Sequence, residues 1–307
     1  ALIHEGLTST GDDAMTDGVF GDIVAGLSED VAAVFGGHTH VAYAGSGAGL
    51  TVVQSTKYGE ALGRIELSVS PAGKVRVSDA EVIDLVDKYV VVDPKTSKET
   101  TVYEPICEGD RKVQDIVDMA DAEAEIVGSV PIGRIGADFN RAVQSDGKEN
   151  RGGESTIGNL IADAQLWGTE LLNTELAFMN PGGIRTDLDY DGDGAPATDL
   201  DGVVTFQEAA EVQPFANTLV TMDLTGAQVI DVLEQQVQPA TASRPFLKLG
   251  VAGLTYQYQP EFDPDGGITK MTITEVKLDS GAPFNENATY RSVVNSFLAS
   301  GGDNFTA

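Results

Sequence analysis

Apolar residues in this 307-residue chain recur in two alternating patterns, and the alternation limits the folds open to it. Short continuous apolar runs, as in residues 31–35, 50–53 and 176–179, are typical of buried strands. Residues 17–27 and 110–126 instead carry apolar side chains at helical spacing. Because helices and strands alternate along the chain, the sequence predicts an α/β fold in which helices are layered on sheets.

The same patterns divide the chain into three parts. We expect residues 1–107 to form one domain, residues 108–126 a linker helix and residues 127–307 a second domain. Further strands are predicted at 62–69, 74–83, 254–258, 270–278 and 290–294, the first two joined by a turn at residues 70–73. Further helices are predicted at 156–172, 205–212 and 225–237, whereas residues 86–107 carry few periodic signals.

The chain is strongly acidic, with a formal net charge of −29. This charge argues against nucleic-acid polymers and anionic membranes as partners, because both bind basic surfaces. An anionic substrate therefore needs a locally positive site, made by metal ions, arginines or helix N-termini. No apolar run approaches the ~18 residues of a membrane helix, so we expect no membrane insertion. The one cysteine, Cys107, excludes an intrachain disulfide.

All three histidines lie within the first 40 residues. His38 and His40 belong to a Gly-Gly-His-Thr-His segment that directly follows an apolar run, and His4 follows a second short run. Because neighbouring strands of an α/β sheet end at one edge, the sequence predicts that these loops deliver imidazoles to one site. Neutral imidazole is the commonest protein ligand for transition metals. The alternative is a set of loop histidines that binds no metal.

Six segments, in order along almost the whole chain, resemble the bacterial 5′-nucleotidase family. They are LIHEG (2–6), GGHTH (36–40), GNLIADA (158–164), NPGGIR (180–185), QPFAN (213–217) and FLASGGDNF (297–305). The resemblance implies that residues 1–107 are the C-terminal part of a metallophosphoesterase β-sandwich domain. It implies that residues 127–307 are the α/β C-terminal domain that recognises the nucleotide.

The resemblance also implies a site for two divalent metal ions, which would be zinc, manganese or cobalt. His4 and His38 would bind one cation and His40 the other. The family's Asp-x-His, Gly-Asp and Gly-Asn-His-Glu segments, which precede the histidine matched by His4, are not among these 307 residues. We therefore expect a fragment that carries the second half of the metal site, has no catalytic histidine of its own and is inactive alone.

In the second domain, the resemblance implies a site that recognises a nucleotide or nucleoside. Its predicted residues are Arg151, Asn180, Gly182, Gly183, Arg185, Phe215, Asn217, Gly250, Phe297 and Asp303. Phe215 and Phe297, which we expect in loops, would stack on the base. Arg185 would pair with phosphate or ribose oxygens, and Arg151 is a second candidate for the phosphate. Asp303 would accept hydrogen bonds from the ribose hydroxyls, and Asn217 would bond the base edge. The alternative is that both phenylalanines are core residues and that Arg185 forms a surface ion pair.

An acidic segment in this domain has the opening pattern of a calcium loop. Its oxygen donors are Asp187, Asp189, Asp191 and Asp193, and Gly192 lies between the last two of them. A glutamate is expected at the twelfth position of such a loop, where this chain has Thr198. Calcium is therefore possible, but a solvated acidic loop is the interpretation we favour.

The resemblance predicts a parent protein that hydrolyses 5′-nucleotides to nucleoside and phosphate. Such an enzyme would be extracellular, at the cell surface or periplasmic. Two alternatives within the enzyme class are a 2′,3′-cyclic nucleotide phosphodiesterase and a nucleotide-sugar hydrolase. The alternative from another class is a non-catalytic module that binds nucleotides.

Overall fold

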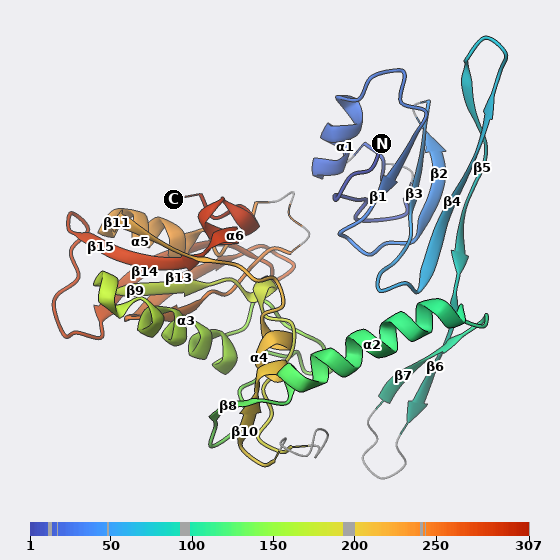
Figure 1. Cartoon of the computed structure of the whole chain (residues 1–307). Helices are drawn as coiled ribbons and strands as arrows, with labels where there is room; N and C mark the ends of the chain where they lie inside the picture. Colours follow the sequence, from blue (N-terminus) through green and yellow to red (C-terminus); the bar gives the residue numbers. More distant parts are fainter. Residues whose placement is uncertain are drawn as a thin grey trace. The chain divides into compact units, whose positions relative to one another are not determined.

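A computed structural model describes residues 1–307 except 12, 13, 17, 48, 93–98, 193–199, 240, 241, 243 and 307. The chain forms two compact units, Ala1–Gln114 and Asp115–Ala307 (Figure 1). Both units combine helices with sheets, as the alternating sequence patterns predicted. No helix in the described part of the chain is both long and apolar enough to cross a membrane.

The first unit is built on a small three-stranded sheet. Its strands are β1 (Ala33–Gly36), β2 (Tyr43–Gly47) and β3 (Leu50–Gln54), in the order β1-β3-β2, and helix α1 (Gly18–Ala25) precedes them. β1 runs parallel to β3, and β2 runs antiparallel to it. All five residues of β3 are buried, which is why this strand is largely apolar in the sequence.

Two antiparallel hairpins complete the first unit. β4 (Ala61–Val69) pairs with β5 (Val75–Asp84), which confirms the predicted hairpin and its turn. β6 (Val86–Val92) pairs with β7 (Glu99–Pro105), in the region where the sequence shows few periodic signals. Six of the seven residues of β6 are exposed, so this strand has no buried face to impose an alternating pattern.

Helix α2 (Arg111–Gly128) confirms the helix predicted from apolar spacing. Asp110 begins it, because its Oδ1 accepts hydrogen bonds from the amides of Lys112 (2.8 Å) and Val113 (3.3 Å). Only Gly128 is buried in this helix. The division between the two units falls inside α2.

The second unit is organised around a four-stranded mixed sheet, coloured from yellow-green to red in Figure 1. The strand order is β11 (Leu219–Thr225), β15 (Thr289–Asn295), β9 (Leu176–Met179) and β12 (Gly250–Ala252). Only β15 and β9 run parallel within this sheet. Leu176 and Phe178 of β9 belong to one apolar cluster and Ala177 and Met179 to another, so both faces of the sheet are covered.

Helix α3 (Thr156–Gly168) contributes to the cluster on one face, and α5 (Gly226–Glu234) and β13 (Leu254–Phe262) contribute to the other. β13 pairs with β14 (Ile268–Leu278). The remaining elements are β8 (Pro131–Arg134), β10 (Val203–Thr205), α4 (Phe206–Val212), α6 (Ser296–Ala299) and the 3-10 turns η1 (Glu170–Leu172), η2 (Pro181–Gly183) and η3 (Gly302–Asn304). α3 and α5 end earlier than predicted, at Gly168 and Glu234.

The backbone of α3 lies directly on β12. A Cβ built on Gly250 would come within 2.2 Å of the Gly158 carbonyl oxygen, so no side chain fits between helix and strand. Ser155 caps the same end of the helix, since its Oγ accepts a hydrogen bond from the Gly158 amide at 3.0 Å. These contacts fix the N-terminus of α3, and with it the chain that leads from Arg151.

Candidate functional site

The first unit brings two of its three histidines together. The ring centroids of His4 and His38 are 5.2 Å apart, and the ring of His40 lies 5.9 Å from that of Tyr58. A parallel bridge between Leu2 and Phe35 aligns the two chain segments that lead into these loops. All three histidines are exposed.

The backbone of the Gly-Gly-His-Thr-His loop is unusual at both histidines. His38 has φ of 66° and His40 has φ of 62°, in the left-handed region that L-residues seldom adopt. Such a conformation costs on the order of 1–3 kcal/mol and persists only where neighbouring contacts enforce it. The loop is therefore held in a shape that histidine itself does not favour.

Gln54, which the sequence analysis missed, provides some of the contacts that hold this loop. Its side chain is buried at the end of β3, where Oε1 accepts a hydrogen bond from the Leu7 amide at 3.0 Å. Its Nε2 donates to Thr39 Oγ1 at 2.6 Å, and Thr39 Oγ1 donates to the Leu7 carbonyl at 2.5 Å. One buried glutamine thus joins the loop that follows His4 to the loop that carries His38.

These histidines fit part of a metal shell. Two neighbouring imidazoles are suitable donors for zinc, manganese or cobalt. Among the residues that the structure describes, however, no group of three or more His, Cys, Asp or Glu side chains is arranged to hold a metal ion. The described part of the chain thus brings two imidazoles together but does not complete a group of three such side chains.

In the second unit, three predicted residues surround Gly182. A Cβ on this glycine would lie 3.4 Å from Arg151 Nη1, 3.4 Å from Asp303 Oδ2 and 3.5 Å from Asn180 Nδ2. Arg185 Nη1 also donates a hydrogen bond to the Gly182 carbonyl at 3.3 Å. The fold therefore gathers two guanidinium groups, one carboxylate and one amide around a residue that has no side chain.

Buried amides hold the carboxylate of this cluster in place. Asn180 Nδ2 donates to Asp303 Oδ2 at 2.8 Å, and Asn295 Nδ2 donates to Asn180 Oδ1 at 2.9 Å. Asn295 also caps α6, because its Oδ1 accepts a hydrogen bond from the Leu298 amide at 2.9 Å. Asn180 and Asn295 are each 2% exposed, so this chain of hydrogen bonds runs through the interior. Asp303 itself has φ of 53°.

Both predicted stacking residues are at the surface, so the alternative that they are core residues is wrong. Phe215 is 56% exposed and Phe297 is 42% exposed. Phe215 lies in a loop as expected, but Phe297 lies in the short helix α6. Asn217, from the Phe215 loop, accepts a hydrogen bond at Oδ1 from Ser296 Oγ at 2.9 Å. This contact joins the two segments that carry the aromatic rings.

The alternative for Arg185 is also wrong. Among the described residues, Arg185 forms no ion pair with a carboxylate. Its guanidinium carbon instead lies 5.6 Å from the centroid of the Phe215 ring, within the range of a cation–π contact. Arg185 thus links the aromatic part of the cluster to Gly182.

Two further predicted residues are explained by packing. A Cβ on Gly183 would come within 2.6 Å of Met179 Cε, and Gly250 is buried against α3. Neither glycine needs a ligand to account for it. Gly250 lies outside the group that surrounds Gly182.

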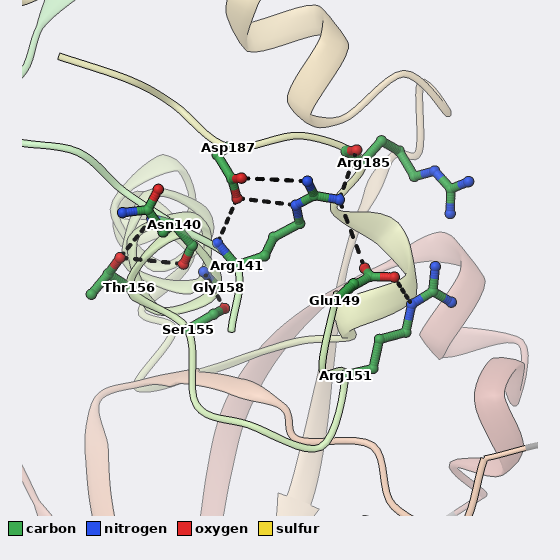
Figure 2. Close-up of polar contacts among 9 residues, drawn as sticks. All are labelled: Asn140, Arg141, Glu149, Arg151, Ser155, Thr156, Gly158, Arg185 and Asp187. Carbon is green, nitrogen blue, oxygen red and sulfur yellow. Dashed lines mark hydrogen bonds and ion pairs between the residues drawn. The ribbon is translucent and has the colours of Figure 1, made fainter. Parts of the chain in front are cut away.

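Ion pairs behind the cluster involve Arg141, which the sequence analysis missed (Figure 2). Its Nε lies 3.0 Å from Asp187 Oδ1, and its Nη2 lies 3.4 Å from Asp187 Oδ2. Burial alone would raise the pKa of Asp187, but the hydrogen bonds and charge of Arg141 outweigh it and hold that pKa below its usual value. The first oxygen donor of the suspected calcium loop is therefore paired with an arginine.

The structure describes two of the other three acidic residues of the suspected calcium loop. Asp189 and Asp191 are exposed, and Asp193 lies outside the described residues.

A second arginine that the sequence analysis missed is Arg244. Its pKa is lowered by partial burial and by the nearby charge of Arg151, whereas Glu149 and Asp303 act in the opposite sense. Arg244 and Arg151 are thus close enough for their charges to interact, with Glu149 and Asp303 nearby.

Comparison with known proteins extends over both units. Residues 131–307 match the family model described as 5′-nucleotidase, C-terminal domain. The trifunctional nucleotide phosphoesterase protein YfkN of Bacillus subtilis is 26% identical over 283 residues, which cover 89% of this chain and 17% of that protein. A snake venom 5′-nucleotidase from Naja atra is 25% identical over 287 residues, which cover 91% of this chain and 48% of that protein.

A solved structure shows the same fold. It is a Staphylococcus aureus protein, provisionally assigned as a 5′-nucleotidase and determined in complex with alpha-ketoglutarate. The TM-score is 0.61 at 17% identity, and the match covers 98% of this chain and 55% of that one. The chain spans from 17% to 48% of the length of the two curated relatives above.

Proposed function

The chain belongs to the 5′-nucleotidase family, whose C-terminal domain matches residues 131–307, and we propose that its second unit recognises a nucleoside 5′-phosphate. Nucleotide hydrolysis is the activity for which members of this family are named. The observation that carries the proposal is the convergence of Arg151, Asn180 and Asp303 on Gly182, close to exposed aromatic side chains. A cluster that combines arginines with a carboxylate suits a ligand that has an anionic group and hydroxyl groups.

Each part of the ligand has a counterpart in this cluster. Phe215 and Phe297 stack on the base, and Asn217 bonds its edge. Asp303, held by Asn180, accepts hydrogen bonds from the ribose hydroxyls. The guanidinium groups of Arg151 and Arg185 pair with the phosphate, because their planar forks match its oxygens. They also supply the local positive charge that an anion needs on this acidic chain.

We propose that the histidines of the first unit bind metal ions in the parent protein. His4 and His38 hold one divalent cation and His40 contributes to a second. Two such ions stabilise charge on a phosphate ester and supply a nucleophilic water when they are bound. The 307 residues contain no other histidine, so we propose that this chain alone does not hydrolyse AMP. The expected result is a rate of phosphate release equal to that of a His38→Ala variant, and metal-dependent release well above that rate would contradict it.

A non-catalytic module that binds nucleotides is the second candidate. It is favoured by the contrast between the two units. The described residues form the cluster around Gly182 but no metal-binding cluster of His, Cys, Asp and Glu. We propose an extracellular, cell-surface or periplasmic location for the parent, a proposal supported by relatives such as a cell wall protein of Listeria monocytogenes and a snake venom enzyme.

Titration calorimetry with adenosine tests the proposed site. We expect weak wild-type binding, with Kd on the order of 0.1–1 mM, because adenosine lacks the phosphate group that would pair with the arginines. Phe215→Ala and Phe297→Ala should each weaken binding by about 1–3 kcal/mol. Phe262→Ala is the matched control, because Phe262 is also exposed but lies on β13. Unchanged adenosine affinity in the Phe215→Ala/Phe297→Ala double variant would reject the base-stacking assignment.

A further inference from the structure

We infer that Arg141 is a positioning residue that holds Arg151 and Arg185 in the orientation that receives the phosphate. The inference rests on the proposed function for the identity of the ligand. Arg141 does not touch Gly182 in any described contact. Its role follows from what it joins behind the cluster (Figure 2).

Arg141 forms a two-pronged contact with one carboxylate. Its Nε and Nη2 face Asp187 Oδ1 (3.0 Å) and Oδ2 (3.4 Å), and its backbone amide donates to the same Oδ1 at 2.6 Å. The side chains of Arg141 and Asp187 are 29% and 30% exposed. Three contacts to one partly buried carboxylate leave the guanidinium plane little freedom to rotate.

The remaining nitrogen of Arg141 reaches both parts of the phosphate site. Nη1 donates to the Arg185 carbonyl at 3.1 Å, which fixes the backbone from which the Arg185 side chain extends. The same Nη1 lies 3.9 Å from Glu149 Oε1. Glu149 Oε2 in turn lies 3.1 Å from Arg151 Nε. One guanidinium therefore connects Arg185 directly and Arg151 through a single carboxylate.

Positive and negative charges alternate along this network of ion pairs. The sequence of groups is Asp187, Arg141, Glu149 and Arg151, with opposite charge at every step. Without Arg141, Glu149 would have Arg151 as its single ion-pair partner among these groups. Glu149 would then draw the Arg151 guanidinium away from Gly182 and neutralise more of the charge of that guanidinium. Arg141 thus keeps Arg151 available to an anion.

Backbone contacts show that the network joins separate loops. Phe139 and Leu188 exchange amide-to-carbonyl hydrogen bonds at 2.8 and 2.9 Å, and Val143 bridges Glu149 across a tight hairpin. These bonds align the loops but do not set the direction of Arg151 or Arg185. Only an arginine has the planar fork to meet the carboxylate of Asp187 and the Arg185 carbonyl together, so lysine is no substitute.

The test compares Arg141→Gln and Arg141→Lys with wild type in calorimetric titrations of AMP and adenosine. We expect both variants to bind AMP about tenfold more weakly and adenosine with unchanged affinity, because in the proposed site the two arginines pair with the phosphate, which adenosine lacks. Arg291→Gln is the matched control, since Arg291 forms an equivalent two-pronged pair with Asp223 at 2.8 and 3.1 Å on the sheet. It should change neither affinity.

A second readout needs no nucleotide. In wild type, the Nε–H of Arg151 is paired with Glu149 and should give a distinct, protected side-chain signal by NMR. Arg141→Gln should shift or broaden that signal, whereas Arg291→Gln should not. An unchanged Arg151 signal would overturn the inference whatever the ligand.

The remaining outcomes separate the inference from the proposed function. Equal loss of AMP and adenosine affinity in Arg141→Gln would assign Arg141 a merely structural role and overturn the inference. Full AMP affinity in Arg141→Lys would show that charge alone suffices and would also overturn it. If wild type binds neither ligand, the proposed function fails, and the NMR signal of Arg151 then decides whether Arg141 positions it.

Discussion

The ring of Phe297 lies against the Cα of Gly302, so closely that a Cβ there would come within 2.4 Å of the ring carbon Cε1. Gly302→Ala should therefore force the ring out of its present orientation. The φ of Gly302 is not in the left-handed region, so the effect is steric rather than backbone strain. We expect adenosine binding to weaken by about 1–3 kcal/mol, the range for one stacked aromatic face, as measured by calorimetry.

Gly136→Ala is the control for this substitution, because a Cβ at Gly136 meets nothing within 4 Å. It should leave both the fold and adenosine affinity unchanged. Retained affinity in Gly302→Ala would show that the orientation of Phe297 is irrelevant to the ligand.

The pair between Asp187 and Arg141 predicts a pH dependence of stability. Because the pKa of Asp187 is lowered in the folded chain, the pair stabilises the fold fully above the unfolded value of about 4, and the contribution is lost as pH falls through the folded pKa. Arg141→Gln should therefore lower the free energy of unfolding at pH 7 and lower it less at about pH 3. Urea unfolding at both pH values measures this, and a penalty that grows in acid would contradict the sign.

A partly buried tyrosine predicts a change at the other end of the pH scale. Burial raises the pKa of Tyr256 to about 12, and Lys248 and Gln236 form hydrogen bonds with its hydroxyl. A raised pKa gives stability that is present below the unfolded value of about 10 and is lost as pH rises through 12. An ultraviolet titration should show one late phenolate transition that Tyr256→Phe removes. If Tyr256→Phe instead removed a transition near pH 10, the raised pKa of Tyr256 would be contradicted.

The histidine loops predict weak metal binding by this chain. His4 and His38 lie close together, but the described residues complete no group of three such side chains, so dialysed protein should retain less than one equivalent of zinc or manganese. Elemental analysis measures the content, and His38→Ala should lower it further. Two tightly held ions per chain would show that the ligand set is complete by another route.

The acidic segment predicts little response to calcium. Arg141 already occupies the carboxylate of Asp187, which removes the first oxygen donor of the suspected loop. Millimolar calcium should leave the melting temperature nearly unchanged. A large rise that disappears in Asp189→Ala/Asp191→Ala would overturn the interpretation of a solvated loop.

Local signals in the sequence identified the elements that have a buried face. Ser155 marks the start of α3 because its hydroxyl caps the helix, and β9 is apolar throughout because both of its faces are covered. β6 escaped detection for the opposite reason, since most of its residues are exposed. The predicted domain limits stay predictions, although the structure divides the chain inside the expected linker helix.

For the candidate site, the resemblance identified residues that the structure gathers around Gly182, but the residues that support them could not be predicted from the sequence. Gln54 acts on Leu7, 47 positions away, and Arg141 acts on Asp187, 46 positions away. Neither separation has a periodic signature, because only the tertiary fold brings the partners together. Polar residues at the end of an apolar strand, as at Gln54, are the one local signal that points to such a role.

The backbone contact between Gly158 and Gly250 restricts how the second unit moves. Packed helices ordinarily slide by small amounts as the side chains between them change rotamer. At Gly158 and Gly250 no side chain separates α3 from β12, so we expect this end of the helix and the strand to shift together. Any opening or closing around a ligand therefore falls to the loops that carry Arg151, Phe215 and Asp303, while the platform beneath them stays fixed.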